Sequence, residues 1–257
     1  MTVPAGFERV ITSGAIALTR SSVRDWVEAT LHGGMTLYDA AQESSQDTME
    51  GRGVVHVVPA PTGEGQRWAV RRYMRGGWLR SLGDRYLRAG TPRPFQELDA
   101  SVAALRRGVP TPSVICAAVY SCGVFYRGDL ITEYVQESRD LASVLFDVSL
   151  EASSEGIAHR IAALAAAGRL IRQMASAGVR HPDVNAKNVL LHGDPDAPDA
   201  MLLDLDRCVI SEPRVSAPII PMYRRLERSL VKWEHRTGRK MSEEECRALR
   251  ADLEAHR

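Results

Sequence analysis

The chain has 257 residues, of which 44% are hydrophobic and 25% are charged. That length fits one large domain or two modest lobes, and the composition excludes a disulfide-dependent miniprotein and a mainly disordered chain. Because 33 Lys and Arg balance 32 Asp and Glu, the net charge is only +1, and we expect no nucleic-acid partner. The four cysteines form no Cys-x-x-Cys pair, which indicates reduced thiols rather than a metal site or a disulfide framework.

We expect neither a secretion signal nor a membrane span. The first ten residues, MTVPAGFERV, lack the basic start and continuous apolar run of a signal peptide. No stretch approaches the roughly 18 apolar residues of a spanning helix. The protein is therefore expected in the cytoplasm, on or off a membrane surface. The sequence gives no indication of the oligomeric state.

The nearly neutral net charge conceals two basic stretches. Residues 71–93 contain seven arginines and one acid, and residues 222–240 contain seven basic residues and two acids. Each is either a solvated face or a site for an anionic partner. In the second stretch Leu226, Leu230 and Trp233 share one helical face, which could enter a membrane interface or could pack on the rest of its own lobe.

In chain order, the first predicted elements are strands. Residues 51–58 and 67–74 are rich in β-forming residues and are predicted to form a hairpin with a long loop. Apolar positions from Phe95 to Leu105 then predict a helix that stops before Gly108 and Pro110. Strand-like patterns resume at 113–120 and 124–135.

After Ser138 the predicted structure is mainly helical. An apolar stripe from Ile157 to Met174 predicts one long helix, closed by Gly178. Ser242 and Glu245 have the spacing of a capping box for a short last helix. The predicted class is α+β, with two lobes: a β-rich N-terminal lobe over 1–135 and a mainly helical C-terminal lobe over 136–257.

The strongest chemical signal is the segment HPDVNAKNVLL at 181–191. It fits H-x-D-x-x-x-x-N followed by a short strand, and a second strand ends in an acid at Asp204. The two strands would form a hairpin that brings Asn188 close to Asp204, and their oxygens suit a Mg²⁺ ion that bridges phosphates. Asp183 would accept the proton of an acceptor hydroxyl. The same arrangement defines the protein-kinase signature, with its H-R-D and D-F-G motifs.

Upstream residues fit a nucleotide site more loosely. Gly51 and Gly53 could form a shortened glycine loop around phosphate oxygens. Arg71 stands where a kinase's V-A-I-K strand has its lysine, and Glu97 on the following helix is its expected ion-pair partner.

Three further residues complete the predicted nucleotide site. Glu133 and Val135, at the link between the lobes, could pair with adenine through their backbone groups. Lys187, inside the loop motif, is a further nucleotide-binding candidate.

At this point the chain resembles a known family, the bacterial lipopolysaccharide kinases, nearest the 3-deoxy-D-manno-octulosonic acid (Kdo) kinases. The resemblance rests on segments that together span about 160 residues, most of the chain. These segments are GRG (51–53), AVRRYMRGGWL (69–79), Asp84-Arg85-Tyr86, Glu97, GVPTP (108–112), YRGDLITEYV (126–135), GVRHPDVNAKNVLL (178–191) and LLDLDRC (202–208).

The resemblance implies a two-lobed, protein-kinase-like fold and transfer of the γ-phosphate of ATP to a Kdo hydroxyl, the 4-OH, of a Kdo-bearing lipid A precursor. In this reading Asp183 is the catalytic base, Asn188 and Asp204 bind Mg²⁺, and Arg71 contacts phosphate. The substrate would place the protein at the anionic cytoplasmic face of the inner membrane, as a peripheral protein.

Two positions depart from the family pattern, and three other functions remain open. Pro182 replaces a small residue and Leu205 replaces a common phenylalanine. The departures leave room for a related acceptor such as a heptose. The missing lysine leaves open a catalytically silent nucleotide-binding module. A small-molecule phosphotransferase would share the loop motif but would not explain the basic stretches.

Overall fold

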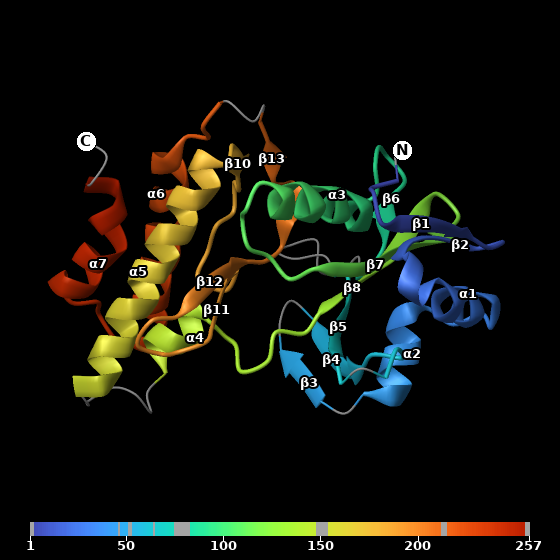
Figure 1. Cartoon of the computed structure of the whole chain (residues 1–257), viewed down its shortest axis with the longest axis horizontal. Coiled ribbons are helices and arrows are strands. Elements are labelled where there is room, and N and C mark those ends of the chain that lie inside the picture. Colours follow the sequence, from blue (N-terminus) through green and yellow to red (C-terminus); the bar gives the residue numbers. More distant parts are fainter. Residues whose placement is uncertain are drawn as a thin grey trace. The chain divides into compact units, whose positions relative to one another are not determined.

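The computed structural model describes residues 3–45, 47–50, 53–63, 65–74, 83–147, 154–211 and 215–254. The chain divides into two compact units (Figure 1). The first unit comprises Met1–Val102 and Ser113–Tyr134, and the second comprises Ala103–Pro112 and Val135–Arg257. Both units contribute candidate site residues, so each is described by itself.

An antiparallel sheet forms the centre of the first unit. Its order is β1-β2-β7-β8-β5-β4-β3, with β6 also paired to β8. The hairpin predicted from residues 51–58 and 67–74 is present as β4–β5, and the strand-like stretches at 113–120 and 124–135 pair as β7–β8. The strands are β1 (Phe7–Ile11), β2 (Ala15–Arg20), β3 (Asp47–Glu50), β4 (Val54–Pro59), β5 (Arg67–Arg72), β6 (Tyr86–Leu87), β7 (Val114–Cys122) and β8 (Phe125–Glu133).

Helices cover both faces of this sheet. A short 3₁₀ turn (Ser21–Val23), α1 (Arg24–His32) and α2 (Leu37–Ser44) pack on one face, where Val70 and Ile131 are buried. Helix α3 (Arg93–Arg106) packs on the other face, against Leu130. The two faces alternate along each strand because successive side chains of a β-strand point in opposite directions. The sequence pattern predicts no element in the first 50 residues, whereas the structure has α1, α2 and three strands there.

The second unit is mainly helical. Its long helix α5 (Ser154–Ser176) buries Leu164, Ile171 and Met174, as the apolar stripe predicted, whereas Ile157 at the start of the stripe is exposed. The short strands form one sheet of order β12-β11-β9 and a separate β10-β13 pair. The other elements are β9 (Arg139–Asp140), α4 (Leu141–Phe146), β10 (Val179–Arg180), β11 (Val189–His192), β12 (Asp199–Leu202), a 3₁₀ turn (Leu205–Arg207), β13 (Val209–Ile210), α6 (Ile219–Thr237) and α7 (Glu243–Glu254).

The predicted capping box begins α7. The Ser242 amide donates to the Glu245 carboxylate over 2.7 Å, and the Glu245 amide donates to the Ser242 hydroxyl over 3.2 Å. Glu245 is buried and also accepts from Arg160. Helix α7 then crosses α5 closely, because a Cβ on Gly168 would lie only 2.7 Å from the Leu249 carbonyl oxygen.

The apolar face of α6 packs inside the second unit. Leu226 and Leu230 are fully buried, and Trp233 stacks on Phe146 with ring centroids 6.1 Å apart. Of the two readings of this face, packing on its own lobe is therefore correct, and the interfacial reading is wrong. In the part of the chain that the structure describes, no helix has the length and apolar character needed to cross a membrane.

Candidate active site

The loop from His181 to Asn188 is held in place by its own first residue. The Asp183 amide donates to His181 Nδ1 over 3.0 Å, so that this nitrogen must carry a lone pair. The hydrogen then sits on Nε2, which donates to the Asp204 carbonyl over 2.9 Å. Burial lowers the pKa of His181, which favours this neutral ring. One imidazole thus joins the loop to the segment that carries Asp204.

Asparagine side chains complete the loop. The amide nitrogens of Asn185 and Asn188 both donate to the Asp183 carbonyl, over 3.0 and 3.3 Å. Asn185 Oδ1 accepts from the Lys187 amide over 3.0 Å. Because its side-chain nitrogen makes this hydrogen bond, Asn188 can offer its side-chain oxygen to a metal ion. Oxygen is the ligand atom that Mg²⁺ prefers.

The predicted hairpin brings Asn188 next to the segment of Asp204. Strands β11 and β12 pair from Val189 opposite Leu202, and the Leu203 amide donates to the Asn188 carbonyl over 2.8 Å. Asp204 has left-handed backbone angles, φ 62° and ψ 57°, which non-glycine residues seldom adopt. Such strain concentrates at functional sites, where the surroundings hold it; here the carbonyl of the same residue accepts from His181.

Asn188 and Asp204 fit a magnesium ion by their chemistry, since an amide oxygen and a carboxylate are hard ligands. A magnesium ion held by these two residues would neutralise negative charge on phosphate groups. Among the described residues no group of three or more His, Cys, Asp and Glu side chains could hold a metal ion. A two-residue site of one amide and one carboxylate does not depend on such a group.

Arg225, on α6, reaches the predicted base. Its Nη2 donates to Asp183 Oδ1. In the sequence this arginine is distinguished only as a member of the second basic stretch, because no pattern links residues 42 positions apart. Lys187 lies within the second unit, with Nζ 3.0 Å from Asp140 Oδ2 and 5.6 Å from the centre of the Trp233 ring.

In the first unit, Arg71 and Glu97 form the expected ion pair. Arg71 Nη2 lies 2.5 Å from Glu97 Oε2, and the Tyr73 hydroxyl donates to the same oxygen. The guanidinium also lies over the Tyr73 ring, 4.6 Å from its centre. Glu97 is buried, whereas the Arg71 side chain keeps 29% of its surface exposed. The buried carboxylate therefore fixes an arginine whose side chain is still accessible to a ligand.

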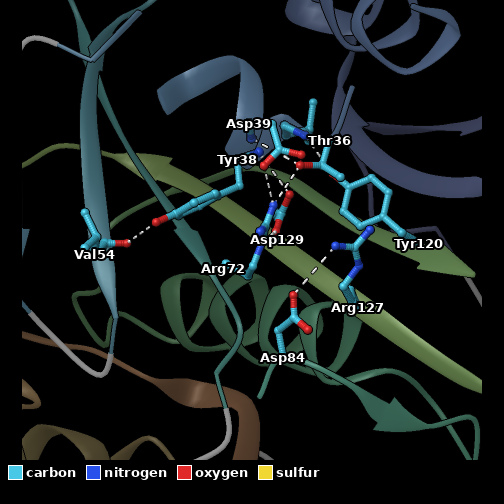
Figure 2. Close-up of polar contacts among 10 residues, drawn as sticks. Thr36, Tyr38, Asp39, Val54, Arg72, Asp84, Tyr120, Arg127 and Asp129 are labelled. Carbon is cyan, nitrogen blue, oxygen red and sulfur yellow. Dashed lines mark hydrogen bonds and ion pairs between the residues drawn. The ribbon is translucent and has the colours of Figure 1, made fainter. Parts of the chain in front are cut away.

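The next residue, Arg72, points to the opposite face of β5 and belongs to a different cluster (Figure 2). Its Nη2 donates to Asp39 Oδ1 over 2.8 Å and to the Thr36 hydroxyl over 3.0 Å, and its Nε lies 3.5 Å from Asp129 Oδ1. Asp129 is fully buried on β8 and also accepts from the Tyr38 amide over 3.0 Å. Burial raises the pKa of Asp129 to about 6, although Arg72 opposes the rise.

The contacts of the other residues predicted to bind nucleotide, Gly51, Gly53, Glu133 and Val135, do not test that role. Gly51 lies outside the described residues, as do residues 75–82 of the first basic stretch. At Gly53 a Cβ would lie 3.1 Å from the Met74 side chain. The Glu133 amide donates to the Ser113 carbonyl over 2.9 Å, and the Val135 carbonyl accepts from the Ser138 hydroxyl over 2.7 Å.

Known proteins similar to this chain are lipopolysaccharide kinases, by family model and by sequence identity. Residues 38–250 match the model of the lipopolysaccharide kinase (Kdo/WaaP) family. A 3-deoxy-D-manno-octulosonic acid kinase of Haemophilus influenzae is 30% identical over 172 residues, which cover 65% of this chain and 68% of that protein. The enzyme of the same name from Xanthomonas oryzae pv. oryzae is 31% identical over 242 residues, 93% of this chain and 89% of that protein.

A solved structure confirms the predicted fold class. The structure described as WaaP in complex with acyl carrier protein aligns with a TM-score of 0.54 over 96% of this chain and 89% of that one, at 17% identity. The protein-kinase-like fold predicted from the sequence, with an antiparallel N-terminal sheet and a helical C-terminal part, is thus correct.

Proposed function

The chain belongs to the lipopolysaccharide kinase (Kdo/WaaP) family, and on that premise we propose that it is an ATP-dependent sugar kinase of the lipopolysaccharide inner core. The acceptor we propose is the 4-hydroxyl of the Kdo sugar on a Kdo-bearing lipid A precursor. The names of the relatives at about 30% identity support this acceptor.

The observation that carries the proposal is the loop of residues 181–188 joined through His181 to the strained backbone of Asp204. In the proposed reaction the acceptor oxygen attacks the γ-phosphorus, the bond from that phosphorus to the bridging oxygen breaks, and ADP leaves. Asp183 accepts the hydroxyl proton. A Mg²⁺ ion held by Asn188 and Asp204 would neutralise charge on the phosphates.

Arg71 takes the place of the usual lysine in this proposal. A guanidinium can bind phosphate through a fork of N–H donors, and Glu97 and Tyr73 already hold it in a fixed position. We also propose nucleotide roles for Gly51, Gly53, Lys187 and the backbone groups of Glu133 and Val135. The alternative of a silent nucleotide-binding module rests on the missing lysine, and the fixed Arg71–Glu97 pair weakens it.

For location, we propose peripheral binding to an anionic membrane through the exposed face of α6. Arg224, Arg228 and Lys232 are exposed on this face, and with Glu227, Val231 and His235 they line a shallow surface hollow in which three cations outnumber one acid. Each basic side chain near an anionic leaflet contributes about 1 kcal/mol of attraction. Arg225 is left out of this surface because it contacts Asp183.

The test is incubation of the purified protein with ATP, Mg²⁺ and Kdo-lipid A precursor, followed by mass analysis for one added phosphate. Asp183→Asn is expected to lower turnover by about 10²–10⁴-fold while ATP binding is retained, since only the proton acceptor is lost. Asp194→Asn, in the exposed turn between β11 and β12, is the matched control. Phosphate on a heptose-bearing acceptor but not on Kdo would favour a heptose kinase, and ATP binding with no transfer to any acceptor would favour the silent module.

A further inference from the structure

Helix α6 runs along the predicted catalytic loop and contacts it at regular intervals. Arg225 donates to Asp183, the Ser229 hydroxyl accepts from the Ala186 amide over 3.2 Å, and Trp233 lies under Lys187. These α6 residues are four apart, so they form one stripe along the helix axis, about 6 Å between neighbours. One stripe of α6 therefore lies beside the loop along most of its length.

Arg225 is the charged residue of this stripe that contacts Asp183, the proposed base. Its side chain is 33% exposed and that of Asp183 is 29% exposed, so neither is sealed from a ligand. A guanidinium carries five N–H donors in a planar fork, which is more than one contact with Asp183 requires. The geometry of the fork matches a second carboxylate.

We propose that Arg225 recognises the carboxylate of an acidic sugar acceptor. This inference rests on the proposed function. For Asp183 to accept the proton, the acceptor hydroxyl must come within hydrogen-bond distance of it, and the other groups of the sugar then lie beside Arg225. A 3-deoxy-D-manno-octulosonic acid carries a carboxylate, whereas a neutral heptose does not. Arg225 would thus select an acidic sugar over a neutral one.

The inference predicts a coupling between one side chain and one group of the substrate. A charge-assisted pair of this kind changes affinity by about 10- to 100-fold. The wild-type protein should bind a Kdo acceptor with a free carboxylate 10- to 100-fold more tightly than the same acceptor as its carboxamide. Arg225→Gln should bind both about equally, and Arg225→Lys should keep part of the preference, since an ammonium lacks the fork.

The experiment measures the dissociation constants of both acceptors by calorimetry, with a non-hydrolysable ATP analogue and Mg²⁺ present. Arg224→Gln, the adjacent exposed residue, is the matched control and should keep the wild-type preference. Thermal melts check that each variant is folded. If Arg225 only positioned Asp183, Arg225→Gln would change turnover but keep the preference for the carboxylate.

Three outcomes separate this inference from the proposed function. A carboxylate preference that Arg225→Gln preserves overturns the inference and leaves the proposed function standing. A wild-type preference that Arg225→Gln removes, with no phosphate transfer to Kdo, supports the inference and overturns the Kdo kinase. A wild-type protein that binds neither acceptor, or binds both equally, overturns the inference whatever its turnover.

Discussion

Substitutions of two neighbouring arginines on β5 should have different effects, one mainly on stability and the other mainly on catalysis. Arg72→Met removes the charge but keeps much of the aliphatic stem, and it leaves the fully buried Asp129 without its cationic neighbour. Breaking a buried ion pair from one side costs about 3–5 kcal/mol. For a chain of this size, in which about 1 kcal/mol shifts Tm by roughly 2–4 °C, the expected loss is about 6–20 °C.

Arg71→Met is the matched comparison on the other face of the same strand. It should lower Tm by less than Arg72→Met, because the Tyr73 hydroxyl still donates to Glu97. It should lower phosphate transfer strongly, since the proposed phosphate contact is lost. Arg72→Met, measured well below its own Tm, should keep most of its turnover. Thermal melts and the transfer assay on the same preparations give both values.

The double variant tests the cause. Arg72→Met with Asp129→Asn removes the unpaired charge of the buried carboxylate and should recover at least half of the lost Tm.

The loss of stability in Arg72→Met should also depend on pH. A carboxyl whose folded pKa is raised from 3.8 to about 6 favours folding below pH 3.8, and this contribution disappears as pH rises through 6. Without Arg72 the folded pKa rises further, so the deficit should grow above pH 6 and shrink towards pH 5. A Tm within about 2 °C of wild type, or no recovery in the double variant, would refute the reasoning.

The other predictions concern the second unit. Gly168→Ala should destabilise the protein by about 1–3 kcal/mol in urea unfolding, because its methyl group would collide with the Leu249 carbonyl; an unchanged midpoint would mean that α7 shifts freely. In ¹⁵N NMR spectra the His181 ring should titrate at a lower pH than in the unfolded chain, with the proton of the neutral ring on Nε2, and its contribution to stability should fall as pH drops below about 6.5, since burial lowers its folded pKa; a ring that titrates at the same pH as in the unfolded chain, or higher, would contradict this. Replacing Arg224, Arg228 and Lys232 by Glu should abolish co-sedimentation with anionic vesicles at low salt while transfer to a soluble acceptor persists; unchanged co-sedimentation would exclude this face.

The parts of the site that could be predicted from the sequence are those whose partners are close along the chain. Asn188 and Asp204 are joined by one hairpin, which two short apolar runs and the turn-rich segment between them predict. Alternation of side chains along a strand puts Arg71 and Arg72 on opposite faces of β5. Alternation does not give the surroundings of Arg72, which come from α2 and β8 and place this side chain in a buried ionic cluster.

Helix α6 shows why the remaining contacts could not be predicted. An apolar stripe flanked by arginines is equally suitable for a membrane interface and for packing on a lobe, because both bury the stripe and leave cations at its edges. Only the position of the helix distinguishes the arginines: Arg224 is exposed, while the next residue, Arg225, reaches Asp183. One turn of a basic helix therefore carries two cations in different surroundings. A charge count assigns both to the same surface, and the single contact with Asp183 is what makes Arg225 a candidate for recognising the substrate rather than the membrane.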